Sequence, residues 1–479
     1  MLNDNLNGRL VRTMRCQCLH FIGIGGSGMN GIAELLLHYG YKVTGSDLKV
    51  NRSIERLRKL GAKITIGHKA SNVKGAEVVV CSSAIDESNP ELVMARKLHL
   101  PIIPRAQMLA EIMRFSAGIA VAGTHGKTTT TSLLAHLLEQ GGLDPAYVIG
   151  GILNSSQRSS HAGAGDFFIV EADESDGSFL RFSPVMAILT NIDRDHLNNY
   201  HMDMEELKLA FIKFIQQLPF YGLAVVCSDD AVVKSLLEHF ERRLITYGFK
   251  KGADVHLSHF EQQGFASKVV INAPKLGWHQ VPISFNLAGR HNALNAVAAL
   301  IIATIGCGLP LAAAAKSLEN FSGVGRRMQR HGWIQLPSAK VLVVEDYGHH
   351  PHEIQATIEA LRGAYDAKRR LAMLFQPHRF SRTADLWQEF VEVLSKVDLL
   401  VLTDIYAASE KPMLGINSSR LANEIRALGS SEVYNCPTTL EATNKLTEHL
   451  QDGDILLVQG AGDVNLAVQF LMERYPNAN

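Results

Sequence analysis

The sequence has no excess of charge of either sign: 47 lysines and arginines balance 47 aspartates and glutamates over 479 residues. A protein that binds nucleic acid or an anionic membrane through a broad surface needs a strong positive field. The balance therefore argues against nucleic-acid and membrane partners. Any anion that this protein binds must be held by a local group of residues.

Cysteines are few, and long apolar runs are missing. Six cysteines are scattered along the chain, and the closest two, Cys16 and Cys18, have a spacing typical of neither zinc sites nor redox motifs. The most apolar stretch, 293–304, is shorter than the roughly 18 residues that a membrane span needs. The N-terminal residues contain no apolar segment of the kind found in signal peptides. We expect reduced thiols and a cytoplasmic location.

Short apolar runs alternate with helical patterns along most of the chain, which is typical of α/β domains. A length of 479 residues with 46% hydrophobic residues allows about three domains. We place them at 1–113, 114–328 and 329–479. The expected fold has a Rossmann-like N-terminal domain, a central domain with a phosphate-binding loop and a mixed sheet, and a Rossmann-like C-terminal domain.

The periodicity of apolar residues predicts individual elements within this plan. Strands are expected at 18–23, 41–45, 77–81, 167–171, 185–190, 223–227, 341–345, 371–375, 398–402 and 454–458. Helices are expected at 29–39, 108–115, 205–217, 353–362, 384–395 and 440–450, and a long helix is expected from about position 291. Residues 254–286 are expected to form antiparallel β structure, with strands at 268–271 and 281–285.

A glycine-rich turn, Gly23-Ile-Gly25-Gly-Ser-Gly28, follows the first expected strand and opens a helix. Glycines let the backbone approach a pyrophosphate closely, and a helix N-terminus offers N–H groups and positive potential. Asp47 stands at the end of the next strand. The pattern favours a diphosphate ligand and, on its own, leans towards a nicotinamide or flavin dinucleotide. A glycine turn without a ligand is the alternative.

A second loop, Gly123-Thr-His-Gly-Lys-Thr128, also lies between an apolar strand and a helix. Lys127 can reach the β- and γ-phosphates of a nucleotide, and the Thr128 hydroxyl can bind Mg²⁺. The usual phosphate-loop spacing needs a glycine at position 121, where this sequence has Val121. A simple helix cap is the alternative, although four consecutive threonines are poor helix formers.

Carboxylates follow two further expected strands. The run Glu171-Ala-Asp173-Glu174-Ser-Asp176 comes after one strand, and Asp193-Arg-Asp195-His196 comes after another. Ligands in open α/β sheets bind at the carboxyl ends of strands, and oxygen donors suit Mg²⁺. Together with the lysine-bearing loop, these runs predict a MgATP site. A chain with both a diphosphate site and a MgATP site fits ATP-driven activation of a diphosphate-bearing substrate.

The motifs jointly resemble those of the Mur ligase family from about residue 18 to about residue 470. The shorter spacing of the family's phosphate loop also accounts for Val121. Further matching segments are Thr190-Asn-Ile-Asp-Arg-Asp-His196, Gly289-Arg-His-Asn-Ala-Leu-Asn295, Asp346-Tyr-Gly-His-His-Pro351 and Phe375-Gln-Pro-His-Arg-Phe-Ser-Arg382.

The resemblance implies an ATP-dependent ligase of cytoplasmic peptidoglycan precursor synthesis. Within the family, the sequence most resembles the alanine-adding branch. In that branch UDP-N-acetylmuramate, L-alanine and ATP react through an acyl phosphate. The resemblance also implies two Mg²⁺ ions and a monomer or weak homodimer. Several sister ligases carry a modified lysine in the helix that follows the Asp-His motif. Here Phe211 stands at that position, so we expect no carbamylated lysine.

The family match assigns residues to each substrate. The implied catalytic residues are Lys127, Glu171 and His196, and the implied metal ligands are Thr128, Glu171 and His196. ATP contacts are implied for Gly123, Thr124, His125, Gly126, Lys127, Thr128, Thr129, His291, Asn292, Asn295, Arg327 and Asp346, with Arg326 as a substitute for Arg327. UDP-sugar contacts are implied for Gly25, Gly26, Ser27, Gly28, Met29, Asp47, Ser82 and His125.

Two arginines after the strand at 371–375 are candidates for holding the amino acid. A guanidinium grips a carboxylate with two parallel hydrogen bonds, which suits Arg379 and Arg382. The match adds Tyr347 and His378 to this site. His349, His350 and His352 form a tempting metal cluster, but we expect polar substrate contacts from the first two and no zinc.

Four rival functions stay open at this point. A murein peptide ligase would attach a tripeptide to the same nucleotide sugar. A folate polyglutamylating ligase shares the ATP domain but lacks a first domain with its own diphosphate loop. A nicotinamide-dependent dehydrogenase would use only 23–47. A non-catalytic nucleotide-binding protein would not need so many polar motifs at strand ends.

Overall fold

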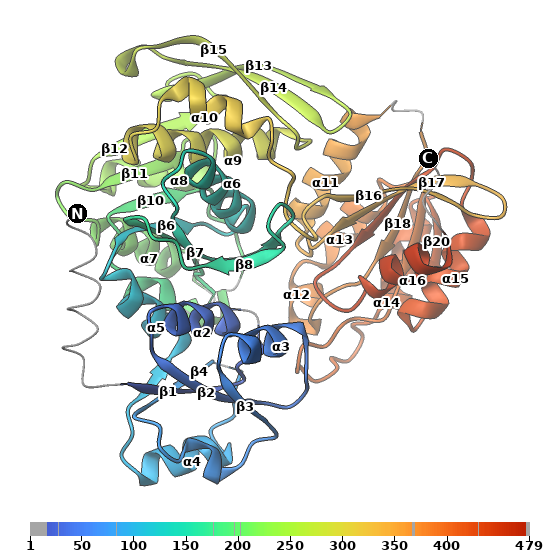
Figure 1. Ribbon diagram of the computed structural model, residues 1–479. Helices are drawn as coiled ribbons and strands as arrows, with labels where there is room; N and C mark the ends of the chain where they lie inside the picture. Colours follow the sequence, from blue (N-terminus) through green and yellow to red (C-terminus); the bar gives the residue numbers. More distant parts are fainter. Residues whose placement is uncertain are drawn as a thin grey trace. The chain divides into compact units, whose positions relative to one another are not determined.

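The computed structural model describes residues 17–475 except 27, 83, 176, 196, 202, 366–368 and 430. It contains three β-sheets flanked by helices (Figure 1). The chain forms two compact units. The first unit comprises residues 1–256 and 295–317, and the second comprises residues 257–294 and 318–479. The three-domain α/β fold class expected from the sequence is confirmed by these sheets and by the structural match given below.

The first unit begins with a five-stranded parallel sheet in the order β3-β2-β1-β4-β5. Its strands are β1 (Cys18–Ile22), β2 (Lys42–Asp47), β3 (Lys63–Ile66), β4 (Val78–Cys81) and β5 (Ile102–Pro104). Its helices are α2 (Met29–His38), α3 (Arg52–Lys59), α4 (Pro90–Lys97) and α5 (Arg105–Met113). The chain reverses its direction of winding between β1 and β4, where doubly wound sheets bind their ligands. This is the expected Rossmann-like domain.

The next sheet of the first unit carries the lysine-bearing loop. Parallel strands β9, β6, β10, β11 and β12 form its body, and β7 adds a parallel strand and β8 an antiparallel one at the edge. The strands are β6 (Ala117–Ala122), β7 (Ala146–Leu153), β8 (Arg158–His161), β9 (Phe167–Ala172), β10 (Met186–Leu189), β11 (Leu223–Cys227) and β12 (Leu244–Gly248). The helices are α6 (Lys127–Gln140), α7 (Met204–Gln216), α8 (Ala231–Leu236) and α10 (Leu311–Leu318).

The chain passes between the units within β13 (Val255–Gln263) and α9 (Arg290–Ile301). In the second unit, β14 (Ala266–Ala273) and β15 (Trp278–Phe285) pair antiparallel, as expected. The first residues of β13, however, pair parallel with β12 through Tyr247 and Val255. The expectation that 254–286 is antiparallel throughout is therefore wrong for β13, because an extended β-run does not reveal the direction of its partner.

The third sheet lies in the second unit and has the order β16-β17-β21-β18-β19-β20. Only β16 is antiparallel. The strands are β16 (Gln329–Gln335), β17 (Lys340–Asp346), β18 (Leu371–Phe375), β19 (Leu399–Leu402), β20 (Glu432–Asn435) and β21 (Ile455–Gln459). The helices are α11 (Pro351–Ala364), α12 (Phe380–Asp385), α13 (Trp387–Leu394), α14 (Ser418–Ala427), α15 (Thr439–His449) and α16 (Leu466–Arg474).

The single helix expected at 384–395 is two helices in the structure. Helix α12 ends at Asp385 and α13 begins at Trp387, because Leu386 between them has φ −114° and ψ 28°, outside the helical range. Among the described residues, no helix is both long and apolar enough to cross a membrane.

Candidate functional site

The lysine-bearing loop is a tight turn between β6 and α6. Gly123 and Gly126 have φ angles of 127° and 83°, a region that favours glycine. A Cβ atom on Gly123 would collide with the Thr190 hydroxyl, and one on Gly126 would lie 2.7 Å from Asn295 Oδ1. Both glycines are therefore required, and predicted residue Asn295 lies against the loop.

Lys127 is held at the first position of α6 by a carboxylate and by its own loop. Its ammonium group lies 2.6 Å from Glu174 Oε2 and donates to the carbonyls of Gly123 at 2.6 Å and Thr124 at 3.2 Å. Burial disfavours the charged amine, but the neighbouring carboxylates, Glu174 first, raise the pKa of Lys127 above its ordinary value. The loop thus presents a fixed positive charge.

Two oxygen donors of the predicted metal site lie together. The Thr128 hydroxyl donates to Glu171 Oε2 at 3.2 Å, and the Gly150 N–H donates to Glu171 Oε1 at 2.7 Å. Glu171 follows the apolar core of β9, so the sheet fixes its backbone. The third predicted ligand, His196, lies outside the described residues.

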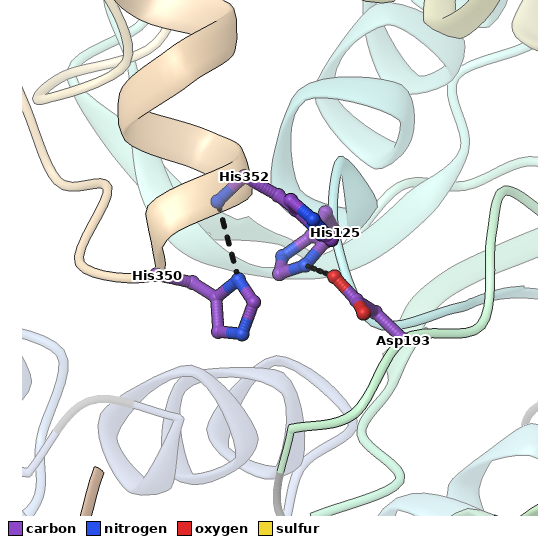
Figure 2. Close-up of side chains that lie close together, drawn as sticks. All are labelled: His125, Asp193, His350 and His352. Carbon is purple, nitrogen blue, oxygen red and sulfur yellow. Dashed lines mark hydrogen bonds and ion pairs between the residues drawn. The ribbon is translucent and has the colours of Figure 1, made fainter. Parts of the chain in front are cut away.

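The loop after β10 clamps the lysine-bearing loop from the other side. Asn191 Oδ1 accepts from the His125 N–H at 2.8 Å, and the Thr124 hydroxyl accepts from the Asp193 N–H at 2.9 Å. His125 Nε2 lies 3.0 Å from Asp193 Oδ2 (Figure 2). These contacts bring together the predicted residues Thr124 and His125. Thr129 is buried one residue beyond Thr128.

The N-terminal glycine turn is stabilised by its own neighbours. The Gly25 N–H donates to Asp47 Oδ2 at 2.8 Å, and the Gly26 N–H donates to the Gly23 carbonyl at 3.1 Å. Asp47 therefore holds the turn in the described structure. Gly28 has φ 81°, and Met29 is buried in the first turn of α2. Ser82 directly follows β4, and Ser27 lies outside the described residues.

An arginine that the sequence did not single out lies against this turn. Arg105 Nη1 stands 2.8 Å from the position that a Cβ atom on Gly28 would take. Arg105 begins helix α5, whose preceding strand β5 belongs to the same sheet. A guanidinium beside a glycine-rich turn at a helix N-terminus adds positive charge where a diphosphate is expected.

His291 and Asn292 lie at the start of α9, in the part that belongs to the second unit. Burial lowers the pKa of His291 to about 4, although Glu359 and Glu353 oppose this shift. His291 is therefore neutral at pH 7. The Asn292 amide donates to the Ala288 carbonyl at 2.8 Å, so part of its hydrogen-bonding capacity holds the segment that precedes the helix.

Asp346 ends β17 and connects three segments of the second unit. Its carboxylate accepts from the N–H groups of Met328 at 2.9 Å and Gly348 at 2.8 Å, and from the Gln459 amide at 2.8 Å. Burial raises the pKa of Asp346 above its ordinary value, against the charge of Arg327. Arg327 lies 5.0 Å from the Tyr347 ring centroid.

Arg326, the substitute for Arg327, is already engaged. It lies 3.0 Å from Glu345 Oε1 and donates to the Gly460 carbonyl at 2.8 Å. The structure therefore places Arg326 in a role that stabilises the loop after β21.

The predicted amino-acid residues form a cluster after β18. Arg382 is buried and its Nη1 lies 3.3 Å from His378 Nδ1. Arg379 has φ 70°, and its Nε is buried with no hydrogen-bond partner among the described residues. The His378 ring stacks on Tyr406 with centroids 5.5 Å apart and planes within 9°. The ring of His349 packs between the rings of Tyr347 and His378 and contacts both.

The two remaining histidines act locally at the start of α11. The His350 side chain accepts from the His352 N–H at 3.4 Å (Figure 2), and Glu353 Oε2 accepts from the His350 N–H at 3.2 Å. This reciprocal arrangement is a capping box, which satisfies N–H groups at the helix N-terminus.

Comparisons with known proteins agree along most of the chain. The Mur ligase family catalytic domain matches residues 19–117, the Mur ligase middle domain matches residues 121–303, and the glutamate ligase domain of Mur ligases matches residues 326–462. A UDP-N-acetylmuramate–L-alanine ligase from Legionella pneumophila (strain Corby) is 49% identical over 462 residues, which are 96% of this chain and 97% of the relative. The chain belongs to the Mur ligase family.

Solved Mur ligases share the fold. The UDP-N-acetylmuramate–alanine ligase from Thermotoga maritima superposes with a TM-score of 0.80 at 28% identity, covering 96% of this chain and 99% of that protein. A murein peptide ligase from Psychrobacter arcticus gives a TM-score of 0.70 at 22% identity, covering 95% and 98%. The second match shows the fold alone.

Several residues that lie in or near the candidate site were not predicted from the sequence. Glu174 was visible only as one of four carboxylates, and its pairing with Lys127 could not be read from spacing. Asn191 lies within a matched motif, but nothing in its position distinguished it from an ordinary loop residue. Arg105 and Tyr406 carried no local signal, because each gains its place only when distant strands pair.

Proposed function

We propose that this chain joins L-alanine to UDP-N-acetylmuramate, with conversion of ATP to ADP and phosphate. The close relatives from Legionella are named for this activity. The observation that carries the proposal is the group formed by Lys127, Glu174, Thr128 and Glu171, together with a second, glycine-rich turn in the same unit. One turn serves ATP and the other the diphosphate of the sugar nucleotide.

The first step transfers the γ-phosphoryl group of ATP to the lactyl carboxylate, which forms an acyl phosphate and releases ADP. Both reactants are anions, so neutralising their charge is the main catalytic task. Lys127 places its ammonium group on the β- and γ-phosphates, and Glu174 keeps that group charged and directed at the loop.

Thr128 and Glu171 fit a Mg²⁺ ion, because a hydroxyl and a carboxylate oxygen 3.2 Å apart are donors that this ion prefers. When bound, Mg²⁺ would neutralise phosphate charge. His196 is the proposed ligand of a second ion. Thr124, His125 and Gly126 would present the loop backbone to the phosphates, and His125 would also face the sugar nucleotide.

In the second step the amine of L-alanine attacks the acyl carbon. A C–N bond forms, the bond to the phosphate oxygen breaks, and the amine loses a proton. We assign Arg379 and Arg382 to the carboxylate of alanine, because the buried Arg379 Nε has no hydrogen-bond partner in the described part of the chain and Arg382 is aligned by His378. Tyr347 and Tyr406 would flank them.

The remaining assignments follow the same proposal. His291, Asn292, Asn295, Arg327 and Asp346 would contact ATP, and Gly25, Gly26, Ser27, Gly28, Met29, Asp47, Ser82 and Arg105 would surround the sugar nucleotide. We also propose domain boundaries near 113 and 328, a reaction in the cytoplasm, and a monomer or weak homodimer.

Phosphate release tests the function directly. Purified protein with UDP-N-acetylmuramate, ATP and Mg²⁺ should release phosphate continuously only when L-alanine is added. The tripeptide L-alanyl-γ-D-glutamyl-meso-diaminopimelate should not replace alanine, and NADH should not bind. Turnover without alanine, turnover without the sugar nucleotide, or a preference for the tripeptide would each contradict the proposal.

A further inference from the structure

A buried carboxylate joins the glycine-turn domain to the central sheet within the first unit. Glu34 lies on α2, is 7% exposed, and pairs with Arg56 of α3 through Oε1. Its other oxygen, Oε2, accepts from the Ser160 hydroxyl of β8 at 2.9 Å. Ser160 is 1% exposed. This bond is therefore shielded from water, and it connects two elements far apart in the sequence (Figure 1).

The same face of α2 also packs tightly against the hairpin of β7 and β8. Gly31 lies one turn before Glu34, on the same side of the helix. A Cβ atom on Gly31 would lie 3.1 Å from Ser160 Cβ and 3.3 Å from Val148 Cγ1. The helix backbone thus approaches the strands more closely than a larger residue allows. Glu34 fixes the position of the helix along the strands, and Gly31 fixes its height above them.

The hairpin leads directly to the proposed metal ligand. Val148 pairs with Ser160 in β8 and with Val170 in β9. Val170 precedes Glu171, and Gly150 of β7 donates its N–H to the Glu171 carboxylate. At its other end, α2 begins at the glycine turn. The two turns proposed to hold the reacting nucleotides are therefore connected by a short series of rigid contacts.

We infer that Glu34 and Ser160 are positioning residues that set the distance between the sugar-nucleotide turn and the lysine-bearing loop. The inference rests on the proposed function, in which the lactyl carboxylate must meet the γ-phosphate of ATP. A displacement of about 1 Å between reacting groups can lower a rate about 100-fold. The ion pair with the half-exposed Arg56 contributes little net stability, so we assign the Glu34 carboxylate a role in geometry.

A double-mutant cycle tests the inference with the full-length protein. Glu34→Ala and Ser160→Ala should each lower kcat about 10-fold while the KM for ATP stays within about twofold, because the ATP loop itself is intact. The double variant should lose little more than Glu34→Ala alone, because that change already removes the acceptor of the Ser160 hydroxyl. Ser159→Ala is the matched control: its side chain points to the opposite face of β8, and kcat should stay within about twofold.

Gly31→Ala gives a second, independent readout. Alanine is a better helix former by about 1 kcal/mol, but the tight contact of its methyl group with Ser160 and Val148 opposes this gain, so the urea midpoint should change little. The added methyl group should nevertheless push α2 from the hairpin and lower kcat about 10-fold. If the contact between α2 and the hairpin serves stability alone, the Gly31→Ala variant should be stable and its kcat unchanged.

The inference is overturned if Ser160→Ala and Gly31→Ala both keep kcat within about twofold of the parent protein, or if the losses in the double variant multiply. It is equally overturned if lost activity follows the fraction of unfolded protein. These results differ from a failure of the proposed function, in which the parent protein itself shows no alanine-dependent phosphate release.

Discussion

Lys127 has two requirements in the proposed reaction: it must stay protonated in a buried loop, and it must point at the phosphates. Glu174 serves both, because its carboxylate lies 2.6 Å from the amine and is the largest single contribution that raises the pKa of Lys127. Its second oxygen, Oε1, is buried and makes no hydrogen bond to a described residue. The lysine therefore compensates the buried charge of the carboxylate, and the carboxylate keeps the lysine protonated.

Replacing Glu174 should weaken catalysis through the lysine. In Glu174→Gln the pKa of Lys127 falls, so the alkaline limb of the kcat/KM profile for ATP should move to lower pH. Lys127→Met should cost about 100- to 1,000-fold at all pH values. Glu205→Gln, an exposed carboxylate on α7, is the control. An unchanged alkaline limb in Glu174→Gln would contradict this role.

Arg105 is expected to act on the sugar nucleotide alone. Arg105→Met should raise the KM for UDP-N-acetylmuramate about 10- to 100-fold with little change in the KM for ATP, because one charge-assisted contact to a phosphate is lost. Arg114→Met removes an exposed arginine just after the same helix and should change neither constant. Equal effects on both nucleotides would show that Arg105 does not serve the glycine turn.

Local spacing predicted Lys127 and Thr128, since a glycine turn between a strand and a helix places the next two residues at the helix N-terminus. Glu174 and Arg105 could not be predicted in this way. Each meets its partner only after strands separated by many residues have paired, and a single sequence does not give that pairing.

Several elements with strong apolar periodicity were predicted with their bounds, whereas polar edge strands and the apolar strands β7 and β12 were missed. The buried strands β11 and β18 have the expected bounds. Strand β8 has the sequence Arg-Ser-Ser-His and no apolar alternation, so it becomes a strand only because β7 pairs with it. Strand β3 is an edge strand with little burial and was missed for the same reason.

Helix α4 is fixed to the first sheet by one buried carboxylate. Burial opposes the charge, but hydrogen bonds from His20 of β1, from Ser46 of β2 and from Asn72 lower the pKa of Glu91 to about 2. The ordinary value is 4.5. Since the folded value lies below it, the ionised form stabilises the domain above pH 4.5, and this contribution disappears as the pH falls from 4.5 to 2.

Glu91→Gln should therefore lower the free energy of unfolding at pH 7 by about 3 kcal/mol. The difference from the parent protein should shrink as the pH falls below 4.5. Urea unfolding at pH 7, 5 and 4, followed by far-UV circular dichroism, measures both quantities. Glu87→Gln, which removes an exposed partner of Arg96, should change stability by less than about 1 kcal/mol. A difference that does not vary with pH would exclude the ionised carboxylate as its source.

At the scale of the whole molecule, the sequence predicted three α/β domains, while the described chain forms two compact units. The first sheet and strands β6 to β12 of the second sheet belong to one unit because α2 and α5 pack on the central domain as well as on their own sheet, as the Glu34–Ser160 bond illustrates. Apolar patterns predict how many sheets a chain forms. They do not predict which helices pack against two sheets at once. Proteins of this size often unfold in more than one step, so the units are expected to melt separately.

Calorimetry can assign those steps. We expect two transitions, and Glu91→Gln should lower only that of the first unit. UDP-N-acetylmuramate at about 100 times its Kd adds about 2.7 kcal/mol to the state that binds it. It should therefore raise the transition that Glu91→Gln lowers, by about 5–10 °C, and leave the other in place. Uridine, which lacks the diphosphate, should give a much smaller shift. If the sugar nucleotide raises only the transition that the mutation leaves unchanged, its binding site does not lie at the N-terminal glycine turn.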